Sequence, residues 1–202
     1  FCLSRGLGDV YKRQELNLSV VGEHNLLNAL AAFTAASALN MAEDKLFTGL
    51  KSFTGTRRRF ELKGEVSGIK VIDDYGHHPT EIIATLTAAK NLAQSARVLV
   101  IFQPHRYSRT AAFFEQFSAA LSNADFTFLL EVYAASEKAI PGVSSLMIAR
   151  NMDQTKVRFE PSMLEVVSEI TKMAKSGDVI ITLGAGDISS LGEPILQSLA
   201  SR

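Results

Sequence analysis

The chain has 202 residues, 47% of them hydrophobic, which is enough to bury the core of one large domain or of one domain and part of another. Lysine plus arginine and aspartate plus glutamate both number 21, and this balance argues against a general nucleic-acid-binding protein. No apolar run reaches the roughly 18–20 residues of a membrane span. The single cysteine, Cys2, excludes an internal disulfide framework and fits a reducing compartment. We therefore expect a cytoplasmic protein without nucleic-acid or membrane partners.

Residues 1–14 do not share the apolar periodicity of the rest of the chain. Gly6 and Gly8 stand among scattered charges, and the chain does not begin with Met. The string Ser-Arg-Gly-Leu-Gly-Asp-Val-Tyr-Lys-Arg (4–13) is similar to translated adapter sequence at the ends of shotgun reads. We expect residues 1–14 to be non-native and the chain to be a fragment, and we leave this segment out of the fold prediction.

Residues 15–52 are helical in character after a short lead-in strand. The run Gly-Glu-His-Asn (22–25) opens an Ala-rich helix expected over 23–39, and a shorter helix is expected through 46–50. The segment 53–60 then breaks the pattern with glycine and charge, which predicts an interdomain linker.

Strand and helix patterns alternate over residues 61–202. The expected strands are 61–66, 69–72, 98–102, 126–130, 157–159 and 179–183, and the expected helices lie near 79–93, 109–122, 143–150 and 162–175. This alternation predicts an α/β fold with a Rossmann-like, doubly wound, mainly parallel sheet. The nearly continuous apolar runs at 98–102 and 179–183 are typical of central strands covered on both faces.

The most informative run is Asp-Asp-Tyr-Gly-His-His-Pro-Thr-Glu (73–81), between an expected strand and an expected helix. Ligands of parallel sheets bind at the carboxyl ends of strands, and the first turn of a helix favours an anion. The acids could bind a ribose hydroxyl or a magnesium-bound water, and the histidines could donate to phosphate or carboxylate oxygens. The alternative is a polar turn with Asp and His as local caps. We favour a ligand site because nearly every side chain from 73 to 78 is reactive or forms hydrogen bonds.

A second polar run, Gln-Pro-His-Arg-Tyr-Ser-Arg-Thr (103–110), follows the buried strand 98–102. Ser108 is the expected N-cap of the next helix. Arg106 and Arg109 would then lie at a helix N-terminus, where the macrodipole disfavours cations. An anion between them would explain that placement, since arginine binds carboxylate or phosphate with a bidentate fork. Two solvated arginines are the alternative.

Two further runs carry weaker signals. Gly-Ala-Gly-Asp (184–187) follows the strand 179–183, and such a turn lets backbone approach a ligand closely, although by itself it is often only a tight turn. At the start of the first helix, His24, Asn25 and Asn28 lie near one another by spacing. They could read an adenine ring, or the asparagines could simply cap the helix. Arg59 could reach a phosphate or be a solvated linker charge.

Other kinds of site find less support in the sequence. The acids and histidines at 73–78 and His105 could build a metal site, but no His-x-x-x-His or His-Glu-x-x-His pair occurs, so we expect no protein-held metal. The chain has no Gly-x-Ser-x-Gly elbow, so the sequence does not support a nucleophilic triad. The chain has neither a Gly-x-x-x-x-Gly-Lys-Ser/Thr phosphate loop nor the Gly-x-Gly-x-x-Gly of a Rossmann-type oxidoreductase.

Together these runs resemble the Mur ligase family. The similar strings, in the family's order, are Gly-Glu-His-Asn-Leu-Leu-Asn-Ala (22–29), Arg-Arg-Phe (58–60), Asp-Asp-Tyr-Gly-His-His-Pro-Thr-Glu-Ile (73–82), Phe-Gln-Pro-His-Arg-Tyr-Ser-Arg-Thr (102–110), Val-Tyr-Ala-Ala-Ser-Glu (132–137) and Gly-Ala-Gly-Asp-Ile (184–188). The resemblance covers about residues 15–202, and the strings at 73–82 and 102–110 resemble the member that adds L-alanine.

The resemblance implies a three-domain enzyme of peptidoglycan precursor synthesis. One domain holds a UDP-sugar, a central domain binds ATP through a P-loop, and the third brings the amino acid. ATP and Mg²⁺ would convert the carboxylate of UDP-N-acetylmuramate to an acyl phosphate, which L-alanine then attacks. This chain would hold the tail of the central domain (15–52), the linker (53–60) and the C-terminal domain (61–202). In such enzymes the third domain closes over the central one, and residues 53–58, with Gly55 among them, would be the hinge. Without the first domain and the P-loop, we expect the chain alone to be inactive.

The resemblance also implies roles for individual residues. The expected nucleotide contacts are His24, Asn25, Asn28, Arg59 and Asp74. The expected catalytic residues are His77, His78, Arg106 and Arg109. The expected substrate contacts are Tyr75, His105, Arg106, Arg109, Gly186 and Asp187.

Two other interpretations stay open from the sequence. The chain could be a stand-alone nucleotide- or anion-binding module without chemistry, which the missing P-loop also fits. It could instead belong to a different amide ligase of the same superfamily, such as one that adds amino acids to folate or to a storage polymer. Competition between L-alanine and other acceptors would separate the ligases.

Overall fold

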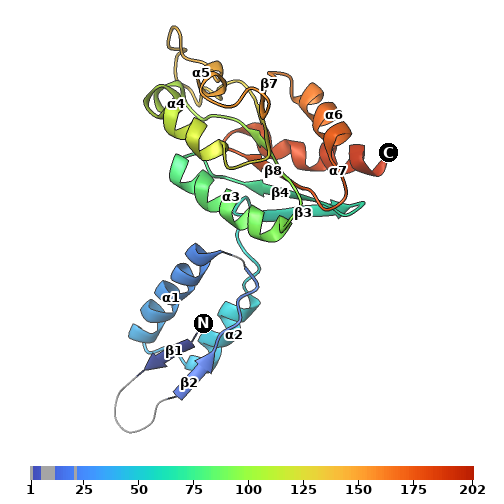
Figure 1. Cartoon of the computed structure of the whole chain (residues 1–202). Helices are drawn as coiled ribbons and strands as arrows, with labels where there is room; N and C mark the ends of the chain where they lie inside the picture. Colours follow the sequence, from blue (N-terminus) through green and yellow to red (C-terminus); the bar gives the residue numbers. More distant parts are fainter. Residues whose placement is uncertain (1, 6–11, 21) are drawn as a thin grey trace. The chain divides into compact units, whose positions relative to one another are not determined.

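The computed structural model describes residues 2–5, 12–20 and 22–202, and for residues 2–5, 12–14, 23 and 24 it describes the backbone alone. The chain divides into two compact units, Phe1–Gly55 and Thr56–Arg202 (Figure 1). Each unit is described by itself. In the part of the chain that the structure describes, no helix is both long and apolar enough to cross a membrane.

The first unit contains a short antiparallel strand pair and two helices. Strands β1 (Cys2–Arg5) and β2 (Lys12–Glu15) pair with Cys2 opposite Glu15. Helices α1 (Glu23–Ala38) and α2 (Glu43–Ser52) lie where the sequence predicts helices. They pack through Phe33 and Phe47, whose ring centroids lie 5.5 Å apart. The assignment of this unit to the tail of an ATP-binding domain stays a prediction.

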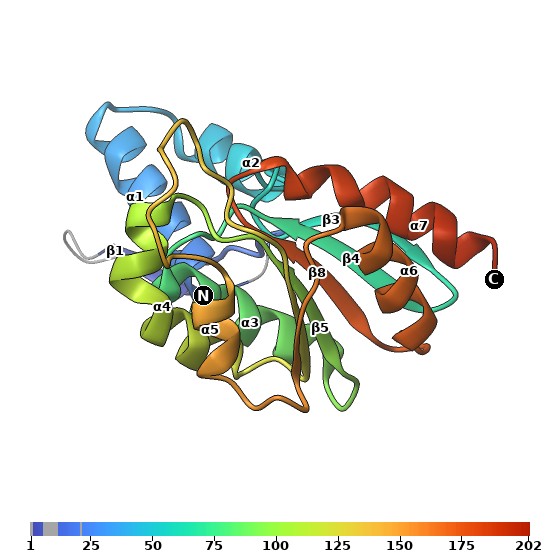
Figure 2. The same cartoon turned by 90° about the horizontal axis from the view of Figure 1, so that it is seen from above.

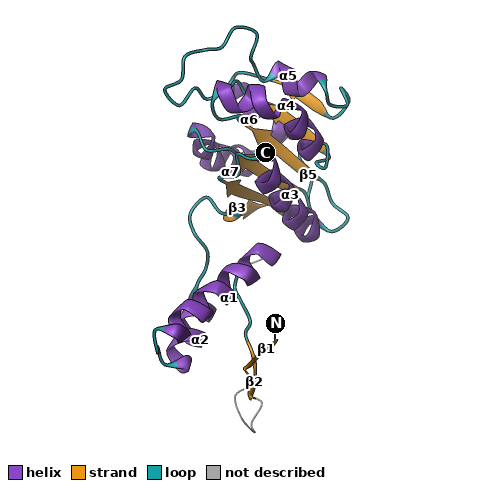
Figure 3. Ribbon diagram, turned by 90° about the vertical axis from the view of Figure 1, so that its left-hand side faces the viewer, coloured by secondary structure: helices purple, strands orange, loops and turns teal. Residues whose placement is uncertain are grey.

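The second unit is built on a six-stranded sheet in the order β3-β4-β8-β5-β6-β7. Its strands are β3 (Glu61–Val66), β4 (Ile69–Asp74), β5 (Val98–Phe102), β6 (Phe126–Leu129), β7 (Val157–Phe159) and β8 (Val179–Leu183). Only the edge strand β3 runs antiparallel to its neighbour, and the other pairs are parallel. Every residue of β5 and β8 is buried. The predicted α/β fold with a mainly parallel sheet is confirmed (Figure 3).

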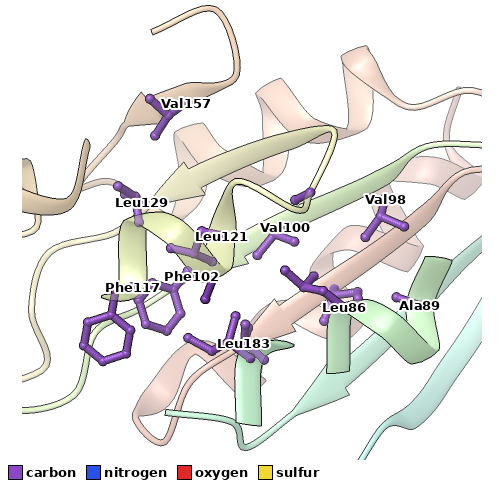
Figure 4. Close-up of a cluster of buried hydrophobic side chains, with 14 of the residues drawn as sticks. Leu86, Ala89, Val98, Val100, Phe102, Phe117, Leu121, Leu129, Val157 and Leu183 are labelled. Carbon is purple, nitrogen blue, oxygen red and sulfur yellow. The ribbon is translucent and has the colours of Figure 1, made fainter. Parts of the chain in front are cut away.

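Helices cover both faces of this sheet (Figure 2). One face packs against α3 (Pro79–Ala93), α4 (Tyr107–Leu121) and α5 (Leu146–Arg150), and side chains such as Leu86 and Phe117 meet Val100 and Phe102 there (Figure 4). The other face packs against α6 (Met163–Met173), the 3₁₀ turn η1 (Asp187–Leu191) and α7 (Gly192–Ala200). The sequence analysis did not predict η1 or α7.

Candidate functional site

Four loops meet at one edge of the sheet because β4, β8, β5 and β6 are parallel neighbours. These loops follow the carboxyl ends of their strands, which is where parallel sheets bind ligands. They contain the runs 75–78, 103–106, 130–137 and 184–187. The sheet topology therefore brings the three polar runs together at this edge, and the loop after β6 joins them.

A row of four aromatic rings crosses this edge. The ring centroids of Tyr75 and His77 lie 5.2 Å apart, and those of His77 and His105 lie 5.9 Å apart. His105 stacks on Tyr133 at 5.6 Å with 12° between the planes. A backbone hydrogen bond also joins the loops after β5 and β6, since Arg106 N donates to the Tyr133 carbonyl at 2.8 Å. Tyr133, 38% exposed, was not among the predicted site residues.

Beside this row lie Arg106 and Arg109, two arginines without a close acidic partner among the described residues. Nη1 of Arg109 and Nδ1 of His105 are buried and have no hydrogen-bond partner among the described residues. Within the described ranges neither Arg106 nor Arg109 has an acidic oxygen within 4.0 Å. Burial lowers the pKa of His105, and the charges of Arg109, His77 and Arg106 lower it further. Buried polar atoms are normally paired, so the arrangement suits an anionic ligand.

The predicted helix cap at Ser108 is wrong. Helix α4 begins at Tyr107, and its N-cap is Arg106, with a φ of 75° and no side-chain cap. Ser108 instead donates its hydroxyl to Glu137 Oε1 at 2.6 Å and its amide to Oε2 at 3.0 Å. These hydrogen bonds lower the pKa of Glu137. An internal carboxylate from the loop after β6 thus satisfies the helix terminus, and neither Arg106 nor Arg109 forms an ion pair with a described residue.

The turn after β4 has both a capping and a site-facing part. His78 is the N-cap of α3, with its side chain accepting from Thr80 N, and Glu81 Oε2 accepts from the backbone amide of His78 at 3.1 Å. Pro79 takes the first helical position, as predicted. His77 lies in the row of rings, and its Nδ1 contacts the carbonyl oxygen of Tyr75 at 3.0 Å. The local-cap alternative therefore describes His78, whose catalytic role stays a prediction.

The two acids lie in the last residues of β4, beyond the predicted end of the strand at 72. Asp74 is 6% exposed, and both its oxygens accept hydrogen bonds: Oδ1 from Gly76 N at 2.8 Å and Thr85 Oγ1 at 3.0 Å, and Oδ2 from Phe60 N at 2.8 Å. The buried carboxylate of Asp73 accepts from Thr182 Oγ1 at 2.7 Å. Both acids organise the loops, and direct contact of Asp74 with a nucleotide stays a prediction.

Of the three arginines just before β3, Arg58 and Arg59 differ in their surroundings. Arg58 contacts Asp73 at 3.3 Å and stacks over Tyr75 at 4.9 Å. The side chain of Arg59 is 55% exposed, and its guanidinium has one long ion pair, 3.7 Å from Glu81 Oε1. A phosphate would therefore find Arg59, and not Arg58, available.

The glycine turn after β8 packs tightly against the loop after β5. A Cβ at Gly186 would lie 2.7 Å from Tyr133 Cγ and closer still to Gln103 Oε1. Gln103 Nε2 also donates to Asp187 Oδ1 at 2.8 Å. Gly186 and Asp187, the predicted substrate contacts, are thus placed by Gln103, a residue whose role the sequence analysis did not assign.

The residues predicted to contact adenine lie in the first unit. Asn25 and Asn28 are on the first turns of α1, half-buried and exposed respectively, and the side chain of His24 lies outside the described residues. Among the residues that the structure describes, no group of three or more His, Cys, Asp or Glu could hold a metal ion.

The model of the Mur ligase glutamate ligase domain matches residues 58–186, which include the four strands of the site edge and the loops after them up to Gly186. The chain belongs to the Mur ligase family.

Known Mur ligases are similar over nearly the whole chain. The UDP-N-acetylmuramate–L-alanine ligase of Renibacterium salmoninarum is 47% identical over 190 residues, covering 94% of this chain and 40% of the relative, and that of Acidobacterium capsulatum is 47% identical over 186 residues, covering 92% and 40%. The crystal structure of the UDP-N-acetylmuramate–alanine ligase of Thermotoga maritima matches with a TM-score of 0.78 at 30% identity, covering 96% of this chain and 41% of that one. This Mur ligase chain therefore spans about 40% of the length of these relatives.

Proposed function

We propose that the chain is the amino-acid-adding part of an ATP-dependent ligase that joins L-alanine to UDP-N-acetylmuramate, a step of peptidoglycan precursor synthesis in the cytoplasm. Curated relatives of that name, 44–47% identical to this chain, support the substrate pair. The structural observation that carries the proposal is the buried, unpaired Nη1 of Arg109 beside the unpaired Nδ1 of His105.

In this proposal the arginines bind the acidic ends of the reactants. Arg109 and Arg106 hold the carboxylate of L-alanine, because a guanidinium fork matches a carboxylate. The same charges stabilise the negative charge that develops as phosphate leaves the acyl group. His105, whose pKa burial lowers, stays neutral near pH 7, so its unpaired Nδ1 adds no positive charge beside Arg109.

In this proposal the row of rings also supplies the proton acceptor for the alanine amine. The carbonyl of Tyr75 can only accept, so Nδ1 of His77 is the donor in that contact, and Nε2 is the ring nitrogen left for the substrate. His77 Nε2 takes the proton that the alanine amine loses on forming the amide bond. Tyr75, His78, Gly186 and Asp187 line the same edge and complete the proposed substrate contacts.

Only some of the residues that we propose as ATP contacts suit its anionic phosphates. ATP supplies the phosphoryl group that activates the acid as an acyl phosphate. Arg59, more than half exposed, binds a phosphate, and Asp74 holds the loop that carries Arg59 through its bond to Phe60 N. His24, Asn25 and Asn28 contact the adenine side. Mg²⁺ comes with the nucleotide, and no described residue of this chain is proposed as its ligand.

The chain alone is proposed to be inactive. Its 202 residues contain no P-loop, so its partners are the UDP-sugar- and ATP-binding domains of the same enzyme. We propose no nucleic-acid or membrane partner.

A chimaera tests this proposal. Residues 15–202 replace the matching segment of the Renibacterium salmoninarum ligase, and phosphate release is measured with ATP, Mg²⁺ and UDP-N-acetylmuramate, with and without L-alanine. We expect L-alanine-dependent release that Arg109→Gln lowers at least 100-fold. The matched control Arg150→Gln, at the exposed end of α5, leaves the rate within two-fold. Release that prefers another amino acid would favour a different amide ligase. A folded chimaera that binds phosphate but releases none would favour the stand-alone anion-binding module.

A further inference from the structure

Arg58 joins three segments of the site edge that are far apart in the sequence. Its Nη2 donates to the carbonyl oxygens of Gly184 at 2.7 Å and Gly186 at 3.2 Å. Its Nε lies 3.3 Å from Asp73 Oδ2, and its guanidinium stacks over Tyr75. The carbonyl of Arg58 also accepts from Tyr75 N at 2.6 Å. One residue therefore binds the glycine turn, the end of β4 and Tyr75 at once.

The backbone of Arg58 is held in a conformation that favours this contact. Its φ of 59° is in the left-handed region, which an arginine adopts only when its surroundings fix it. Its amide donates to Glu61 Oε2 at 2.8 Å, which supports that conformation from the start of β3.

The glycine turn depends on outside partners for its shape. Gly184 has a φ of 150°, and a Cβ there would lie 2.7 Å from the carbonyl oxygen of Gln103. Gln103 holds the turn on one side through Asp187, while the two carbonyls converge on Arg58 on the other. A planar fork can serve an acid and two carbonyls together, whereas the single ammonium group of lysine cannot reproduce that spacing.

We propose that Arg58 is a positioning residue: it fixes the glycine turn and Tyr75 relative to each other and so places Tyr75, Gly186 and Asp187 for the amino-acid substrate. The structural part of this inference stands on the contacts of Arg58. The part that concerns the substrate rests on the proposed function. Neighbouring Arg57, which is exposed and forms no side-chain hydrogen bond or ion pair with another described residue, offers a matched control.

The first arm of the test is amide hydrogen exchange of the chain, read residue by residue by NMR. Arg58→Gln should speed exchange at least ten-fold at Gly184, whose amide bonds to the Asp74 carbonyl, and at Ile188, whose amide bonds to Gln103. Val100, in the centre of the sheet, should change less than two-fold. Arg57→Gln should leave all three amides unchanged. If Arg58→Gln does not fold, the double variant Arg58→Gln/Asp73→Asn removes the unpaired buried acid and is measured instead.

The second arm is kinetics in the chimaera. Arg58→Gln and Arg58→Lys should each raise KM for L-alanine at least ten-fold, with a smaller change in kcat, and Arg57→Gln should stay within two-fold. Unchanged exchange at Gly184 and Ile188 would overturn the inference. Faster exchange with an unchanged KM would also overturn it, because Arg58 would then only stabilise the fold through its ion pair with Asp73. If the unsubstituted chimaera is inactive, the proposed function fails, and the exchange arm alone decides whether Arg58 holds the turn.

Discussion

Asp74→Asn should destabilise the second unit because the carboxylate accepts three hydrogen bonds in a buried site. An amide keeps one acceptor oxygen, which can still serve Gly76 N and Thr85 Oγ1. Its NH₂ group then faces Phe60 N–H, so the bond at 2.8 Å is lost and two donors meet without an acceptor. A lost hydrogen bond to a charged group and a buried unsatisfied donor together cost about 2–4 kcal/mol.

Urea unfolding followed by circular dichroism measures this cost. For a domain of this size, 2–4 kcal/mol corresponds to a fall in Tm of about 4–16 °C. The control Glu115→Gln changes an exposed carboxyl on α4 that has no hydrogen-bond or ion-pair partner among the described residues, and its effect should stay within about 0.5 kcal/mol. An Asp74→Asn chain as stable as that control would refute the assignment of Asp74 as the organiser of these loops.

Three further changes test other parts of the site. Gly186→Ala should lower the free energy of unfolding by about 1–3 kcal/mol because its Cβ would overlap the Tyr133 ring, whereas Gly49→Ala, in open space within α2, should be neutral or stabilising by up to about 1 kcal/mol; equal effects in urea unfolding would refute the close packing. Because burial lowers the pKa of His105 in the folded chain, the unfolded chain binds the proton more readily, so stability should fall as pH drops from about 6.5 to the lowered pKa; His105→Asn should remove that component, and identical pH profiles of the two proteins would contradict it. Gly55 has a φ of 107°, which proline cannot adopt, so Gly55→Pro should lower kcat in the chimaera; unchanged kinetics would contradict the hinge at 53–58.

The sheet could be predicted because its signals are local. The runs 98–102 and 179–183 are apolar throughout, and they form the central strands buried on both faces. The site edge followed from the same pattern, since parallel strands end at one edge. The same rule could have predicted Tyr133 as a site residue, since it comes soon after the strand at 126–129. Helix α7 had a signal as well, with Pro194 in its first turn and apolar residues at 195, 196 and 199.

Other features depend on partners that are distant in the sequence. The strand β4 continues through Asp73 and Asp74 because Thr182, Arg58 and Phe60 bind their carboxylates. Ser108 has the composition of an N-cap, but Glu137, 29 residues away, takes that part. No local pattern reveals such a contact, and none distinguishes the paired Arg58 from the exposed Arg59 beside it.

We propose that this chain selects L-alanine for attachment to UDP-N-acetylmuramate, and the mass of the product tests that proposal most simply. The chimaera is incubated with ATP, Mg²⁺, UDP-N-acetylmuramate and an equimolar mixture of the twenty amino acids, and the UDP-sugar products are weighed by mass spectrometry. We expect one main product, heavier than the substrate by a single alanine residue. A product that carries another amino acid, or phosphate release without any amide product, would contradict it.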